Sequence, residues 1–242
     1  MYKRQIETFT HFEELNSMLI KTFEHTRENN FSEIVFSSGE YSFTTRLFED
    51  FPEARNLQGK GTGAKITSAS MGRMPFAFLE SVNDENEYYK LLGRINNERV
   101  YRWIKREYIE KTLSLDKWNV LVPKANGSGA LGEVLSTPLI GQPLIGHKDT
   151  FLTIGAFDTE LEAENCMKYI KSKFARAMLG VLKITQDNPK SVWKKIPLQD
   201  FTPNSDIDWT KSIPEIDQQL YAKYGLSQDE IDFIEEKVKA ME

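Results

Sequence analysis

The amino-acid sequence predicts an α+β fold, in which a mixed β-sheet body has flanking helices and a helical C-terminal tail. Two observations lead to this fold class. Apolar side chains recur at helical spacing near both ends of the chain, and short strand-like runs alternate with glycine, proline and asparagine in the middle. Apolar residues make up 40% of the 242 residues, which is enough for a sizeable core.

Residues 9–28 predict the first helix, because apolar side chains fall on one face at Phe12, Leu15, Leu19 and Phe23. A capping box of Thr10 and Glu13 is expected at its start, and two asparagines end it. Two short strands are expected next, in "SEIVFSS" and "YSFTTRLF". Residues 56–78 predict a loop punctuated by glycine and a further strand.

Residues 86–112 are ambiguous. Tyr88, Leu91 and Leu92 indicate a short helix, which Asn96 and Asn97 would end. The following run, "RVYRWIKREYI", alternates as a strand does but carries basic side chains on both faces, so a second helix is the alternative. Residues 120–122 then predict a buried strand.

One long helix is predicted from Asp158 onward, with an apolar stripe that ends at Val181. A second face of this helix is basic, at Lys168, Lys171 and Arg176. The run "SVWKKIPL" predicts a short strand. Two helices follow in the tail, at residues 214–224 and 228–241, and the second fits a capping box of Ser227 and Glu230.

The glycines at positions 127, 129 and 132 form a G-x-G-x-x-G pattern after a strand, with Asp149 further along the chain. This is the spacing of a dinucleotide-binding turn. Such a turn needs a helix directly after the glycines, because the pyrophosphate binds to the helix N-terminus. Pro138, Pro143 and two further glycines interrupt the segment that would form it. We therefore predict no cofactor site here.

Charge is unevenly distributed along the chain, although the net charge is only −5. Residues 165–195 hold eight lysines and arginines against one aspartate, whereas residues 196–242 hold four lysines against eleven acidic residues. Basic side chains interleaved with aromatic ones could neutralise phosphates, also in the run 99–106. The candidate DNA-binding residues are Lys65, Arg73, Arg102, Lys124, Asn126, Lys148, Lys168, Lys171, Lys173 and Arg176.

Other chemistry has little support in the sequence. Asp206 and Asp208 are a possible pair of metal ligands, but aspartates in a turn commonly close local hydrogen bonds. We predict no catalytic residue, no metal site and no bound cofactor. Cys166 is the single cysteine, which excludes a disulfide framework. No apolar run reaches the roughly 18 residues that suggest a membrane span, and the N-terminus lacks a signal peptide, so a cytoplasmic location is expected.

Three stretches together resemble a known family: "KWNVLVPKANGSG", "FLTIGAFDTELEAENCMKYIKSKFARAML" and the tail from "KKIPLQDF" to "EEKVKAM". They are similar to the C-terminal target-recognition region of bacterial N6-adenine DNA methyltransferases in type II restriction–modification systems. Two further stretches, "FSEIVFSSGEYSFTT" and "MGRMPFAFL", resemble the start of that region. The resemblance covers residues 31–242. Its implied division is an N-terminal helix at 1–30, a DNA target-recognition domain at 31–200 and a packed helical tail at 201–242.

The catalytic motifs of that family are missing, since the sequence contains no Asn-Pro-Pro-aromatic motif and no matching glycine turn. The resemblance therefore implies a chain that reads double-stranded DNA for a methyltransferase domain supplied upstream or as a separate subunit, with S-adenosylmethionine bound by that domain. The chain would be a fragment, a truncated product or a specificity subunit. A protein-interaction module and a metal-dependent nuclease are the alternatives.

Overall fold

The computed structural model describes residues 10–67, 69–96, 98–125, 127 and 129–241. These residues form two compact units. Unit 1 comprises residues 1–35, 125–138 and 161–242, and unit 2 comprises residues 36–124 and 139–160. This division differs from the predicted boundaries at residues 30 and 200. The N-terminal helix and the tail share one unit because they contact each other and the helices of residues 160–180.

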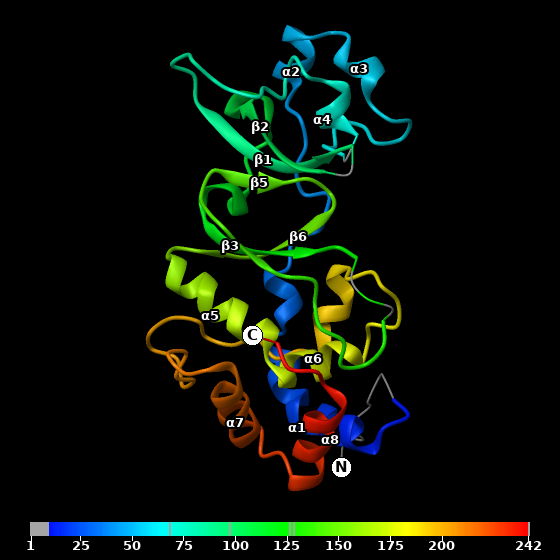
Figure 1. Cartoon of the computed structure of the whole chain (residues 1–242), viewed down its shortest axis with the longest axis vertical. Coiled ribbons are helices and arrows are strands. Elements are labelled where there is room, and N and C mark those ends of the chain that lie inside the picture. Colours follow the sequence, from blue (N-terminus) through cyan, green and yellow to red (C-terminus); the bar gives the residue numbers. More distant parts are fainter. Residues whose placement is uncertain (1–9, 68, 97, 126, 128, 242) are drawn as a thin grey trace. The chain divides into compact units, whose positions relative to one another are not determined.

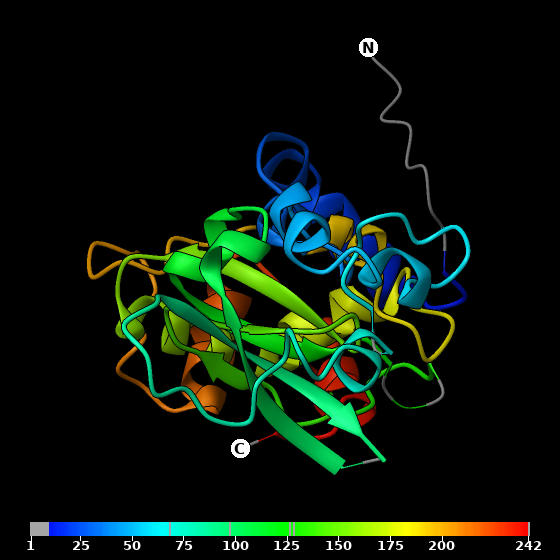
Figure 2. The ribbon, with the colours of Figure 1, turned by 90° about the horizontal axis from the view of Figure 1, so that it is seen from above.

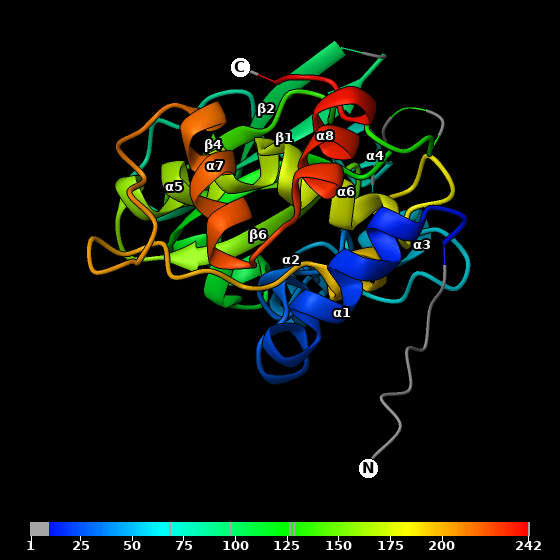
Figure 3. The same ribbon diagram turned by 90° about the horizontal axis from the view of Figure 1, so that it is seen from below.

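Unit 1 is helical and has a core rich in aromatic side chains. Helix α6 contacts α1, α7 and α8, and α1 contacts α8 (Figure 3). Tyr169 lies at the centre of this core, where its ring packs against Phe31, Phe201 and Trp209. The helices are α1 (Glu13–Glu28), α5 (Glu160–Lys171), α6 (Lys173–Gly180), α7 (Ile213–Lys223) and α8 (Gln228–Lys237), with 3-10 turns η1 (Phe31–Ile34) and η4 (Lys190–Lys195).

The predicted long helix from Asp158 is in fact two helices, which meet at Ser172. The Ser172 hydroxyl accepts a hydrogen bond from the Ala175 amide at 3.1 Å and so caps α6. The buried carboxylate of Asp217, on α7, accepts the amides of Lys173 at 3.0 Å and Phe174 at 2.9 Å. These three bonds satisfy amides that a continuous helix would have paired internally.

Unit 2 contains two three-stranded sheets and several short helices (Figure 1). The first sheet has the order β2-β1-β5 and is mixed, because β1 pairs antiparallel with β2 and parallel with β5. The second has the order β4-β3-β6 and is antiparallel. The strands are β1 (Tyr88–Ile95), β2 (Glu98–Lys105), β3 (Trp118–Pro123), β4 (Leu139–Gly141), β5 (Ile145–His147) and β6 (Phe151–Phe157).

The short helices of unit 2 pack around the first sheet, and α4 contacts β1. They are α2 (Thr45–Asp50), α3 (Ala54–Leu57) and α4 (Ser70–Arg73), with 3-10 turns η2 (Arg106–Tyr108) and η3 (Leu113–Asp116). Leu91 and Ile104, from β1 and β2, lie in the main core with Phe43, Phe78 and Leu47. The predicted α+β fold with a mixed sheet and a helical tail is therefore confirmed.

Several local predictions were wrong. The segment around Tyr88 is strand β1, not a helix, and "RVYRWIKREYI" forms β2 and then η2. The expected strand "SEIVFSS" begins with η1, and "SVWKKIPL" is mostly η4. In "YSFTTRLF" only isolated bridges at Ser42 and Phe43 precede α2, and residues 56–67 and 69–78 form short helices and turns instead of a strand.

Of the two predicted capping boxes, the one at the start of α1 was wrong and the one at the start of α8 was confirmed. The expected box of Thr10 and Glu13 does not form, since α1 begins after Phe12 and Thr10 accepts the Phe12 amide instead. The box of Ser227 and Glu230 at the start of α8 is confirmed.

Candidate nucleic-acid interface

The basic face predicted on residues 168–176 is largely occupied by the tail. The Lys168 ammonium donates to the carbonyl oxygens of Trp209 at 2.6 Å and Lys211 at 3.3 Å. The Lys173 ammonium pairs with the Glu235 carboxylate at 2.5 Å. These cations therefore hold the tail to the rest of unit 1, and their ammonium groups already have partners there.

Arg176 is the clearest correction, because only 3% of it is exposed. Its guanidinium donates to the carbonyl oxygens of Lys171 at 3.1 Å, of Glu133 at 3.4 Å and of Lys239. Burial lowers the pKa of Arg176 to about 10. A side chain enclosed in this way cannot reach a DNA phosphate, so Arg176 has a structural role.

Lys148 is likewise buried, with 1% exposed, so its predicted DNA contact is also wrong for this fold. Its aliphatic chain fills the space beside Gly93 of β1, and burial lowers the pKa of its ammonium. Arg102 points to the core side of the hairpin and pairs with Glu80 at 2.7 Å. Lys171 is half-buried on α5.

Lys65, Arg73 and Lys124 are exposed in unit 2, as a DNA contact requires. Arg73 ends the short helix α4, and its guanidinium donates to the Leu57 carbonyl at 3.5 Å. Asn126 lies outside the described residues. Exposure of these three basic side chains permits contact with phosphate but does not by itself mark a binding surface.

The most coherent basic surface lies on the β1–β2 hairpin, whose two long strands run side by side (Figure 2). Pairing in register places Lys90 opposite Trp103 and Tyr88 opposite Lys105. Because side chains alternate along a strand, one face of the hairpin turns to the main core and the other carries basic and aromatic side chains. Leu92 lies on this second face too, where it is buried against Leu121 and Phe151. We call the second set the hairpin face; it consists of Lys90, Arg99, Tyr101, Trp103 and Lys105.

Cations and rings are interleaved on the hairpin face. The Lys90 ammonium lies 5.0 Å from the centroid of Tyr101 and 5.2 Å from that of Trp103. The Arg99 guanidinium lies 5.6 Å from the ring of Phe151 on β6. Tyr101 is 44% exposed. Within the described residues neither Lys90 nor Arg99 forms an ion pair; Arg99 is exposed and Lys90 is partly buried.

Part of the hairpin face was not predicted from the sequence. Lys90 belonged to a predicted helix, where it would not align with Tyr101 and Trp103. The alternation of residues 99–109 was recognised, but without β1 its basic and aromatic side chains had no partner strand. An adjacent pair of strand-length runs separated by two asparagines was the available signal for a hairpin.

Comparison with known proteins adds no family to this description. The sequence matches no protein-family model, and no curated protein resembles it significantly. None of the described helices is long and apolar enough to cross a membrane.

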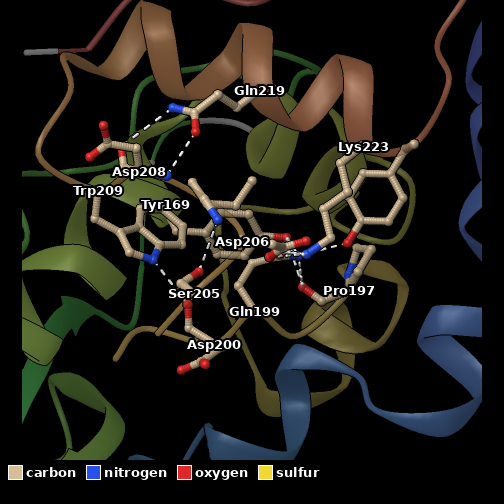
Figure 4. A network of polar contacts seen from close by, with 12 residues as sticks. Tyr169, Pro197, Gln199, Asp200, Ser205, Asp206, Asp208, Trp209, Gln219 and Lys223 are labelled. Atoms are coloured by element: carbon tan, nitrogen blue, oxygen red, sulfur yellow. Dashed lines mark hydrogen bonds and ion pairs between the residues drawn. The ribbon is translucent and has the colours of Figure 1, made fainter. Parts of the chain in front are cut away.

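The two aspartates considered as metal ligands have separate local partners (Figure 4). Asp206 pairs with Lys223 at 2.8 Å, while Asp208 accepts the Thr210 amide at 3.0 Å and its hydroxyl at 2.6 Å. Gln219 of α7 closes the same loop through the Asp208 backbone. Across the described part of the chain, no three His, Cys, Asp or Glu side chains form a group that could hold a metal ion.

The glycine pattern folds onto the protein itself. The Gly129 amide donates to the Glu133 carboxylate at 3.1 Å, where a phosphate would bind in a dinucleotide turn. Gly132 packs against the end of α8, and its carbonyl accepts the Lys239 amide at 3.0 Å. Residues 133–138 contain no helix and lead towards β4. These glycines permit close packing, and their surroundings do not fit a cofactor.

Proposed function

We propose that this chain binds double-stranded DNA and selects a short sequence for an N6-adenine methyltransferase of a type II restriction–modification system. The hairpin face is the observation that carries the proposal, since Lys90 and Arg99 lie beside aromatic rings on a pair of hydrogen-bonded strands and form no ion pair within the described residues. The resemblance of residues 31–242 to target-recognition regions supports the same function. The protein would act in the cytoplasm.

A two-stranded β-ribbon fits the major groove of B-DNA, which is about 12 Å wide. In this arrangement Lys90 and Arg99 would contact phosphates and fix the position of the ribbon, because such contacts carry no sequence information. Tyr101 and Trp103 offer a hydroxyl, a ring N–H and apolar edges to the bases between them. Sequence selection would therefore depend on the aromatic residues more than on the lysines.

Catalysis would belong to a separate methyltransferase domain, supplied upstream or in trans, which flips the target adenine out of the helix. S-adenosylmethionine would bind that domain. The glycine segment of this chain is not its site, because Glu133 and α8 fill the space around Gly129 and Gly132.

Salt-dependent binding to random-sequence duplex DNA tests the proposal by fluorescence anisotropy. The slope of log affinity against log salt is expected to be about −0.9 for each phosphate neutralised. Lys90→Ala and Arg99→Ala should each reduce the magnitude of that slope by about 1. Lys111→Ala is the matched control, because Lys111 is exposed in the same unit but lies outside the hairpin face.

Selection from the random pool tests sequence reading. Repeated rounds of binding should enrich one short sequence, and Tyr101→Ala should weaken that enrichment while non-specific affinity remains. Absence of duplex binding at low salt would refute the proposed function. Binding with a slope that responds equally to Lys90→Ala and Lys111→Ala would place the interface elsewhere.

A further inference from the structure

A chain of hydrogen bonds lies buried inside unit 2, behind the strands of the hairpin. The Glu40 carboxyl oxygen Oε1 lies 2.8 Å from the Thr153 hydroxyl, which lies 2.6 Å from His147 Nε2. The other ring nitrogen, Nδ1, is 2.6 Å from the Lys148 carbonyl oxygen. Ser114 donates its hydroxyl to the same Glu40 oxygen at 3.0 Å. Four segments of unit 2 therefore meet at one network.

The geometry limits where the protons can be. A carbonyl oxygen only accepts, so His147 Nδ1 must carry a proton to bond to Lys148. In a neutral imidazole, Nε2 is then an acceptor, and the Thr153 hydroxyl must donate its one hydrogen to it. Thr153 has no hydrogen left for Glu40, so the Glu40 carboxyl must itself be protonated and donate to Thr153.

One other proton arrangement satisfies the same distances, with a charged imidazolium at His147 and a carboxylate at Glu40. It places two charges in the interior, where His147 is 0% exposed and the Glu40 side chain is 7% exposed. It also leaves the second carboxylate oxygen, Oε2, buried without a hydrogen-bond partner. Burying an unpaired charged oxygen is far less favourable than burying a neutral carbonyl oxygen. The neutral arrangement is therefore favoured.

Burial raises the pKa of the Glu40 carboxyl and outweighs the hydrogen bonds from the hydroxyls of Tyr41, Thr153 and Ser114, which lower it. Tyr41 and His147 are the titratable groups that face Glu40, from the same loop and from β5, while η3 and β6 present the Ser114 and Thr153 hydroxyls. Within the described residues, no lysine or arginine pairs with Glu40 to stabilise a carboxylate. Burial lowers the pKa of His147 to about 4.

We propose that Glu40 is protonated at neutral pH and that its proton latches the strands beside the hairpin face, so that deprotonation loosens unit 2. The mechanical link is short, because His147 on β5 pairs directly with Leu92 on β1. The effect on DNA rests on the proposed function, whereas the protonation state of Glu40 does not.

The direction in which pH changes the stability of unit 2 follows from the difference in pKa between the folded and unfolded states. A carboxyl group whose pKa is raised by folding stabilises the fold fully below its unfolded value, which is about 4.3 for Glu. That contribution to stability is lost as the pH rises through the pKa of Glu40 in the folded protein. His147 acts in the opposite sense, because its lowered pKa withdraws stability as the pH falls from about 6.5 towards 4. The network is therefore most stable at mildly acidic pH.

Infrared difference spectroscopy of the full chain tests the protonation directly. The wild-type spectrum minus that of Glu40→Gln should contain the carbonyl band of a protonated carboxylic acid at neutral pH, and the band should disappear as the pH rises. Glu110→Gln, at an exposed glutamate of the same unit, should give no such band. In wild-type protein alone, nitrogen NMR should show His147 neutral with its proton on Nδ1, so the test survives if Glu40→Gln fails to fold.

Melting between mildly acidic and alkaline pH tests the latch. The melting temperature of wild type and Glu110→Gln should fall more steeply with pH than that of Glu40→Gln. Duplex affinity should fall over the same pH range in wild type and stay level in Glu40→Gln. A missing acid band, a charged His147 at neutral pH or identical pH profiles would overturn the inference. Absence of DNA binding at every pH would overturn the proposed function and leave the infrared result decisive for Glu40.

Discussion

Replacing Gly132 by alanine should strongly destabilise unit 1. Gly132 has a φ of +76°, which disfavours any residue with a Cβ atom by about 1–2 kcal/mol. The added Cβ would also lie 2.0 Å from the carbonyl oxygen of Lys237 and 2.8 Å from the Cα atom of Val238. Both neighbours are backbone atoms of α8 and its end, so relief requires a backbone shift costing about 1–3 kcal/mol. The two terms predict a loss of about 2–5 kcal/mol in the free energy of unfolding.

Gly225→Ala is the matched control in the same unit. Gly225 also has a positive φ, +59°, but an added Cβ would meet no heavy atom within 4 Å. Only the backbone term remains, so we expect a loss of about 1–2 kcal/mol. Urea unfolding followed by far-UV circular dichroism measures both variants. Equal losses for Gly132→Ala and Gly225→Ala would refute the close packing of the glycine segment on α8.

Two further substitutions test the interior of unit 1. Arg176→Met removes the donor to three carbonyl oxygens, so stability should fall by about 2–4 kcal/mol; the salt slope of DNA binding should not change, which anisotropy can verify. Burial raises the pKa of Asp217 to about 6, so its contribution is present below the unfolded value near 4 and is lost as the pH rises through 6. The full loss is about 3 kcal/mol, of which about 1–2 kcal/mol falls between pH 5 and pH 8; Asp217→Asn should abolish this part in the free energies of urea unfolding compared at those two pH values.

The elements that depend on local sequence were predicted well. Helices α1, α7 and α8 lie where apolar spacing and breakers placed them, and the Ser227 box starts α8. Strand β1 was missed because both of its faces are buried: Leu91 packs in the main core and Leu92 against Leu121 of β3. An apolar run without alternation does not distinguish a strand from a helix.

The candidate site was predicted less well, because whether each basic side chain is exposed depends on contacts with residues distant in sequence. The spacing of Lys168, Lys171 and Arg176 predicted a basic helix face. The carbonyl oxygens of Trp209 and Lys239, which accept hydrogen bonds from Lys168 and Arg176, belong to the main chain and cannot be inferred from side-chain identity. The break at Ser172 similarly depends on Asp217 of α7. Main-chain acceptors and distant caps are features of the fold, and a single sequence does not reveal them.

The binding of these cations by the tail has a consequence for how shortened chains are interpreted. A chain ending before Trp209 would lose the acceptors of Lys168, together with Glu235 and the Lys239 carbonyl. The positive charges of Lys168, Lys173 and Arg176, which bind the tail in the intact protein, would then be exposed. Any DNA affinity that such a truncation gains over the intact chain would come from these freed cations, so deletion mapping would point to the wrong surface while point substitutions in the full chain would not.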